Sequence, residues 1–184
     1  MRAYFKSENE STNYFKTIRE GEHMDLNILW LVPVAYGIHI IEETPRFVPW
    51  AKKYISAPST FGQFVLGNVI FMAYVIISVF LATFFPGEWT LVLGLSTAAW
   101  IFSNFTIHAF FTLTTGEYSP GVVTAGAIYV PVAVYIYSSA LASGMLSGPD
   151  LIVSVVLGFS IMYVPTLIQM WRGKWRNRSG SAAT

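Results

Sequence analysis

The sequence predicts an all-α fold, a polytopic membrane bundle with about five transmembrane helices, and three observations support this prediction. The 184 residues are 54% hydrophobic and only 11% charged, whereas a soluble domain carries about 25% charged residues. The apolar residues gather in runs of roughly 20, the length that crosses the hydrocarbon core of a bilayer. The 14 Phe, 10 Tyr and 6 Trp are typical of spans with aromatic belts at the membrane interfaces. We therefore expect a protein integral to a membrane.

Prolines and turns divide the apolar sequence into its helices. Pro45 and Pro49 follow the first run and end it, because proline lacks an amide donor and clashes with the preceding turn. Pro131 lies inside the fourth run and predicts a kink, since it leaves a carbonyl one turn earlier without a partner. The expected spans cover residues 26–43, 61–85, 88–114, 122–146 and 151–171.

The polar segments give the domain organisation and the orientation. Residues 1–25 form a polar N-terminal segment, residues 26–171 the transmembrane helical domain, and residues 172–184 a basic, flexible C-terminal tail. Aromatic and basic residues alternate over residues 46–54, which predicts a short helix at the membrane surface. With five spans, that loop and the tail lie on one side and hold seven of the 11 Lys and Arg. The positive-inside rule then puts the C-terminus in the cytoplasm and the N-terminus outside, most simply in the cell's inner (plasma) membrane.

Three ionisable residues, His39, Glu42 and Glu43, end the first span. Side chains three and four positions apart share a face of a helix, so both carboxylates can lie beside the imidazole. Ionisable groups in a membrane helix are costly, and they usually face inward and serve a function. The chain has no Cys, so a metal site would use His, carboxylate, amide or hydroxyl ligands. The net charge of +1 gives no sign of a nucleic-acid partner.

Two further segments bring polar groups to the same leaflet. His108 lies about two turns before the end of the third span, and Asn104 lies one turn deeper on the same face. Glu117 follows in the next loop. This convergence predicts one His/Glu site near the cytoplasmic leaflet. We expect the metal ligands to be His39, Glu42 and His108, and the catalytic groups to be Glu43, Asn104 and Glu117.

Two imidazoles and a carboxylate suit Zn²⁺ or non-haem Fe²⁺ with open positions for water or substrate. Glu43 or Glu117 would then act as a general base or orient a ligand, and Asn104 would hold a ligand or polarise the substrate. The depth of the site favours an apolar or lipid-like substrate that enters from the bilayer. Hydrolysis, isomerisation and oxidation are all compatible with this metalloenzyme hypothesis.

A non-catalytic role is the main alternative. The chain would then be a small subunit of a larger membrane complex, with His39 and His108 as axial ligands of a haem or pigment. The carboxylates argue mildly against it, because an axial histidine rarely needs two acids beside it. The hypothesis of a proton or ion path through Glu42 and Glu43 has less support still. No further charged residues line the opposite leaflet, so the path would lack its second half. The simplest structural explanations are histidine hydrogen bonds between helices, an ion pair of Glu43 with Arg46 and a solvated Glu117.

The same residues resemble a known family. The segment His39-Ile40-Ile41-Glu42-Glu43 resembles the signature of the HXXEE-domain membrane proteins. Residues 104–108 resemble the family's N-x-x-x-H element, and residues 118–121 its Y-N-P-G element, with Ser119 in place of Asn. The resemblance covers residues 28–170, about the whole hydrophobic part. It implies an integral membrane protein with an enzymatic role but no assigned reaction.

Overall fold

The computed structural model describes residues 24–55, 60–144 and 147–181, with side chains described up to residue 172. These residues form helices joined by turns, and no strand occurs among them. The helical stretches long and apolar enough to cross a membrane are Leu26–Glu43, Phe61–Phe84, Glu88–Thr115, Val122–Ala142 and Gly148–Arg172. The predicted all-α bundle with five spans is therefore confirmed. The predicted segment 1–25 lies almost wholly outside the described residues, and the domain limits at 25 and 172 stay predictions.

The first span consists of two helical segments. A short 3-10 helix, η1 (Leu26–Trp30), runs directly into α2 (Leu31–Glu43). Asp25 caps η1 by accepting a hydrogen bond from the Asn27 amide at 2.9 Å. The chain then turns at Thr44-Pro45 and forms α3 (Phe47–Tyr54), the short helix that the aromatic and basic pattern predicts.

Helices α4 (Phe61–Phe84), α5 (Glu88–Thr115) and α8 (Gly148–Ser181) are the long helices of the bundle. Thr60 and Gln63 form a capping box that begins α4. Gly116 ends α5 in the left-handed conformation that favours glycine, with φ of 67°. Helix α8 continues past Trp171, where the fifth span was expected to end.

The fourth span is irregular just before Pro131, and the kink expected at the proline stays a prediction. It begins as α6 (Val122–Thr124), widens into a π-helical turn, η2 (Ala125–Tyr129), and continues as α7 (Val130–Ala142). The Val130 amide donates to the Ala125 carbonyl, five residues earlier. The wide turn lies immediately before Pro131, and the helix continues past the proline without a break.

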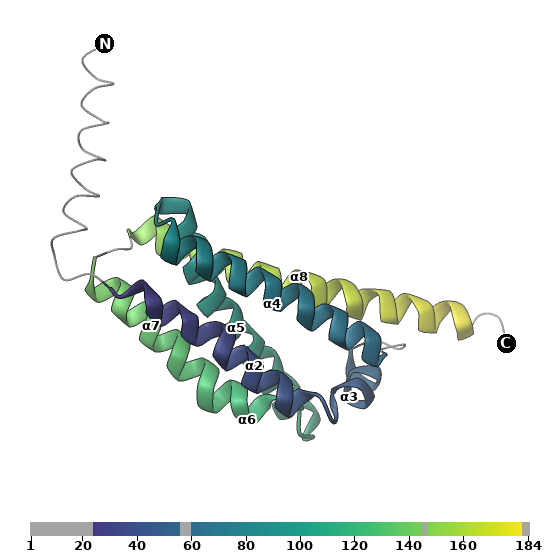
Figure 1. Cartoon of the computed structure of the whole chain (residues 1–184). Coiled ribbons are helices and arrows are strands. Elements are labelled where there is room, and N and C mark those ends of the chain that lie inside the picture. Colours follow the sequence, from purple (N-terminus) through teal and green to yellow (C-terminus); the bar gives the residue numbers. More distant parts are fainter. Residues whose placement is uncertain (1–23, 56–59, 145–146, 182–184) are drawn as a thin grey trace, which may run out of the picture.

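Helix α5 is the centre of the bundle. Helices α2 and α7 lie along one side of it, α4 and α8 lie along another, and α3 sits near the ends of α2 and α4 (Figure 1). Of the most apolar stretch of α5, 61% is buried, against 17–33% for the other spans. Gly158 of α8 allows close packing, because a Cβ there would lie 2.7 Å from the Ala99 Cβ of α5. Large apolar side chains such as Ile41 and Leu113 stay exposed on the outside, as expected for an integral membrane protein.

Candidate metal centre

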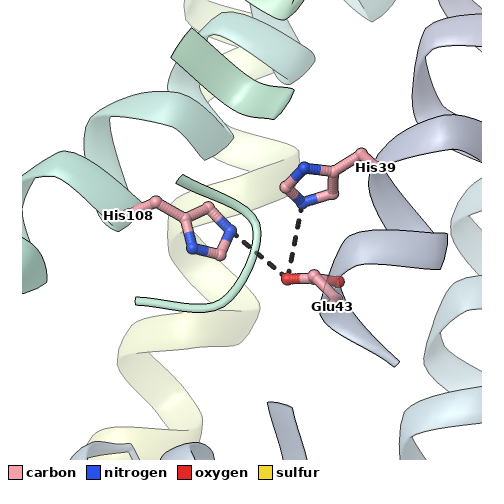
Figure 2. Close-up of side chains that lie close together, drawn as sticks. All are labelled: His39, Glu43 and His108. Carbon is pink, nitrogen blue, oxygen red and sulfur yellow. Dashed lines mark ion pairs between the residues drawn. The ribbon is translucent and has the colours of Figure 1, made fainter. Parts of the chain in front are cut away.

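Two histidines and one glutamate meet between α2 and α5. The Glu43 Oε1 atom lies 3.4 Å from His39 Nε2 and 3.3 Å from His108 Nε2. Figure 2 shows both imidazoles directed at this one carboxylate oxygen. The three residues are buried, His39 completely. One ligand atom from each residue lies within 4.8 Å of the others, the only such group of three His, Cys, Asp or Glu among the described residues.

Each imidazole is hydrogen-bonded to a hydroxyl group through the nitrogen that faces away from Glu43. His39 Nδ1 is 2.9 Å from Thr124 Oγ1, and His108 Nδ1 is 2.8 Å from Ser119 Oγ. Each ring therefore has its Nδ1 atom engaged and turns its Nε2 atom toward Glu43. His39 Nε2 makes no hydrogen bond with the described residues, although it is buried. An imidazole fixed through one nitrogen with the other nitrogen free is the usual arrangement of a metal-binding histidine.

Gly121 brings the backbone against this centre. It has φ of 99°, in the left-handed region where a side chain is strained. A Cβ at this position would lie 2.5 Å from His39 Cε1 and 2.9 Å from Glu43 Cγ. Both the conformation and the close approach require glycine, which gives the last residue of the 118–121 element a physical role.

Glu42 has a different environment from Glu43. Its carboxylate accepts hydrogen bonds from the Thr124 amide at 2.7 Å, the Val123 amide at 3.3 Å and the Tyr118 hydroxyl. The first amides of a helix have no partner within the helix, and a carboxylate there is favourable. Glu42 thus ties the start of the fourth span to α2 and thereby positions Thr124. The structure brings Glu43, and not the expected Glu42, together with the histidines.

Glu117 lies on the surface. Its Oε1 atom is 2.5 Å from Lys53 Nζ, and both side chains are more than half exposed. The hydrogen bonds from Lys53 and Tyr54 lower the pKa of Glu117, and the bond to Glu117 raises the pKa of Lys53. The pair connects α3 to the loop after α5. Glu117 is therefore not brought to the three buried residues.

A cavity of about 470 Å³ adjoins the centre. Glu43 and His108 line it, together with Asn104, which lies one turn deeper than His108 on α5. The Asn104 amide nitrogen is 3.9 Å from the Met162 sulfur, and its Oδ1 atom is buried without a hydrogen-bond partner among the described residues. Asn104 thus faces the same space as two of the three clustered residues, as its spacing from His108 predicts.

The sequence did not indicate three of the neighbours of this centre. Thr124 lies inside an apolar run, and nothing in the sequence marks it. Ser119 belongs to a recognisable turn, but only the folded chain brings its hydroxyl to His108. Trp50 of α3 stacks on the His108 ring, with centroids 6.3 Å apart and planes 29° apart, and the sequence indicated only an interfacial aromatic residue.

The distances suit one small metal ion. Two ligands bound at 2.0–2.2 Å in tetrahedral geometry lie about 3.3–3.6 Å apart. The separations of 3.3 and 3.4 Å between Glu43 Oε1 and the histidine nitrogens fall in this range. Two imidazoles and a carboxylate are also a donor set that Zn²⁺ and Fe²⁺ accept. All three ligand atoms lie within 4.8 Å of one another, so the residues present can hold one ion after a side-chain adjustment of at most about 1.5 Å.

Comparisons with known proteins identify one matching family and no relative of known function. The family model described as "Protein of unknown function with HXXEE motif" matches residues 30–136, more than half of the chain. The match includes His39, Glu43, His108, Ser119 and Gly121. No curated protein and no solved structure matches the chain.

Proposed function

This chain belongs to the HXXEE family, and on that premise we propose that it is a membrane-embedded metalloenzyme that acts on an apolar or lipid-like substrate. His39, Glu43 and His108 would hold one divalent ion, Zn²⁺ or Fe²⁺. The observation that carries the proposal is the convergence of two oriented imidazoles on one buried carboxylate oxygen, at 3.4 and 3.3 Å.

Burial is the physical argument for an ion. A carboxylate and two imidazoles cut off from water lose their hydration, and this loss must be compensated. A hydrogen bond from His108 compensates part of it, but His39 Nε2 has no hydrogen-bond partner. A cation between the three residues would neutralise the carboxylate and give His39 Nε2 a partner.

The same geometry argues against the haem or pigment alternative. The centroids of the His39 and His108 rings are 5.1 Å apart and the ring planes meet at 69°. Two axial ligands need a macrocycle between them, and Glu43 Oε1 lies only 3.4 and 3.3 Å from the two Nε2 atoms that would have to bind it. A single metal ion bound at about 2.0–2.2 Å needs no such space.

The adjoining cavity supports an enzymatic role over a purely structural ion. A bound divalent ion supplies Lewis acidity or an activated water. Asn104 can accept a hydrogen bond from a substrate or water through its free Oδ1 atom, and Trp50 covers His108 and limits access of water. Glu42 acts as a positioning residue, since it holds Thr124, which orients His39.

Metal analysis tests the first part of the proposal. The purified full chain is expected to contain one equivalent of zinc or iron by mass spectrometry of the elements. The His39→Ala variant should lose it, and His23→Ala, which removes the third histidine of the chain, should keep it. Equal metal content in the two variants would contradict the proposed centre.

Activity on lipids tests the second part. A membrane lipid extract is incubated with the metal-loaded protein, with the chelated protein and with the Glu43→Gln variant, and is then compared by mass spectrometry. We expect at least one lipid to change with the loaded protein alone. If no lipid changes in any sample, the enzymatic part of the proposal fails even if the metal is present.

A further inference from the structure

The cavity beside the metal centre has a mainly apolar interior formed by three helices, although Asn68, Asn104 and Thr166 also line it. Phe64 and Phe71 line it from α4, Trp100 and Ile107 from α5, and Met162 from α8. Trp100 lies about two turns deeper along α5 than His108, roughly 12 Å from it. The cavity therefore extends well below the level of the metal centre, and its volume of about 470 Å³ is in the range that holds one small organic molecule.

The other end of the cavity is polar and exposed. Thr60 and Gln63 stand at the start of α4, and Gln169 and Arg172 stand on the last turns of the membrane stretch of α8. All four residues are exposed. The cavity thus changes from a polar rim to an apolar interior, with Glu43 and His108 in its wall. This distribution matches one amphiphilic molecule whose polar head lies at the rim and whose apolar chain lies in the interior.

The cavity has a side open to lipid. Helices α4 and α8 both pack on α5 but hardly contact each other in the part of the chain that the structure describes. Gly67 of α4 lines the cavity and is only half-buried, and a Cβ added there would meet nothing within 4 Å. A chain can therefore reach the interior sideways from the bilayer, without passing through water.

The walls also carry polar atoms without partners. The indole nitrogens of Trp50 and Trp100 are buried and have no hydrogen-bond partner among the described residues, and both residues line the cavity. An indole nitrogen only donates hydrogen bonds. A buried donor without a partner costs free energy, so an occupant whose head brings an acceptor oxygen to Trp50 is favoured over a pure hydrocarbon.

We propose that this cavity binds one single-chain lipid with an oxygen-bearing head, a fatty acid or a simple derivative of one, and admits it between α4 and α8. The inference rests on the proposed function, because this lipid would be the substrate class of the metal centre. The head lies near Arg172 and Trp50, the first carbons pass Glu43 and His108, and the rest of the chain extends toward Trp100.

Photo-crosslinking of the full chain in detergent micelles tests this proposal. The probe is palmitic acid with a diazirine in its chain, and the labelled residues are identified by mass spectrometry. We expect saturable labelling of residues that line the cavity. Unlabelled palmitic acid should compete for it, and hexadecane should not. Labelling confined to exposed apolar side chains, or competition by both compounds alike, would overturn the proposal.

Two glycine substitutions on α4 provide a matched pair. Gly67→Leu places a side chain in the cavity, whereas Gly62→Leu places one outside it, and neither added Cβ meets an atom within 4 Å. Gly67→Leu should weaken palmitic acid binding about tenfold, the effect of excluding two methylene groups from an apolar site. Gly62→Leu should bind as the original protein does. Equal binding by both variants would overturn the proposed position of the chain.

The metal content separates this inference from the proposed function. Gly67→Leu should keep its metal and its unfolding temperature, so that weaker labelling reports on the cavity alone. A protein that holds its metal but shows no saturable labelling overturns the lipid inference and leaves the metal centre in place. A protein that is labelled in the cavity but holds no metal overturns the proposed function and supports the cavity as a lipid site.

Discussion

Gly121→Ala is expected to disturb the candidate metal centre without removing a ligand. The new Cβ would lie 2.5 Å from His39 Cε1, so the ring or the loop must move by roughly 1 Å to restore an ordinary van der Waals contact. The left-handed backbone costs about 1–2 kcal/mol for a residue with a side chain. The overpacking adds about 1–3 kcal/mol.

Gly116→Ala is the matched control. Gly116 also has a left-handed backbone, with φ of 67°, but a Cβ there would meet nothing within 4 Å. Gly116→Ala should lower the free energy of unfolding by only about 1–2 kcal/mol, the cost of a left-handed backbone for a residue with a side chain. Gly121→Ala should lower the free energy of unfolding by about 2–5 kcal/mol, the sum of the backbone and overpacking costs. The difference in this free energy between the two variants measures the cost of the contact with His39 and Glu43.

Metal affinity is the more specific measurement. Ligand distances in a metal site must hold to within about 0.2 Å, so a displaced His39 ring should weaken binding by about 10–100-fold. Competition with a chelator of known affinity measures this, and thermal unfolding of the same samples measures stability. If Gly121→Ala binds zinc as tightly as Gly116→Ala, the loop does not shape the centre and this reasoning fails.

Three further outcomes are expected. Ser119→Ala removes the hydroxyl that orients His108 and should weaken metal binding by about 10–100-fold in the chelator assay. It should also lower the free energy of unfolding by about 1–3 kcal/mol, because His108 Nδ1 then stays buried without a partner. The pair of Lys53 and Glu117 stabilises the fold above the ordinary pKa of Glu117 and below that of Lys53. This small contribution should disappear as pH falls through the lowered pKa of Glu117 or rises through the raised pKa of Lys53. A pH-dependent difference in unfolding temperature between the original protein and Glu117→Gln measures it, and a constant difference would contradict it. Gly158→Leu forces apart α5 and α8, where a Cβ would already lie 2.7 Å from a neighbour, and should lower the unfolding temperature sharply.

Hydropathy and proline positions were enough to predict the spans, because the bilayer fixes the length of an apolar helix. The convergence of His39 and His108 also followed from the sequence. Alternating span directions place the end of the first span and the end of the third span in one leaflet. The structure confirms that the two rings lie together, with centroids 5.1 Å apart.

The choice between Glu42 and Glu43 could not be made from the sequence. On a helix, Glu42 lies about 60° to one side of His39 and Glu43 about 40° to the other, so both share its face. The deciding contacts are tertiary, since the free amides of Val123 and Thr124 bind Glu42 and leave Glu43 to the histidines. Sequence spacing contains no information about where another helix begins.

The central claim is that Glu43 and not Glu42 completes the metal centre, and the metal content of two isosteric variants tests it most directly. Glu43→Gln and Glu42→Gln each remove one charge from adjacent positions of α2. Elemental analysis of the two purified proteins should find about one equivalent of metal per chain in Glu42→Gln and almost none in Glu43→Gln, because an uncharged amide is a poor ligand for these ions. Metal retained by Glu43→Gln and lost from Glu42→Gln would contradict the claim.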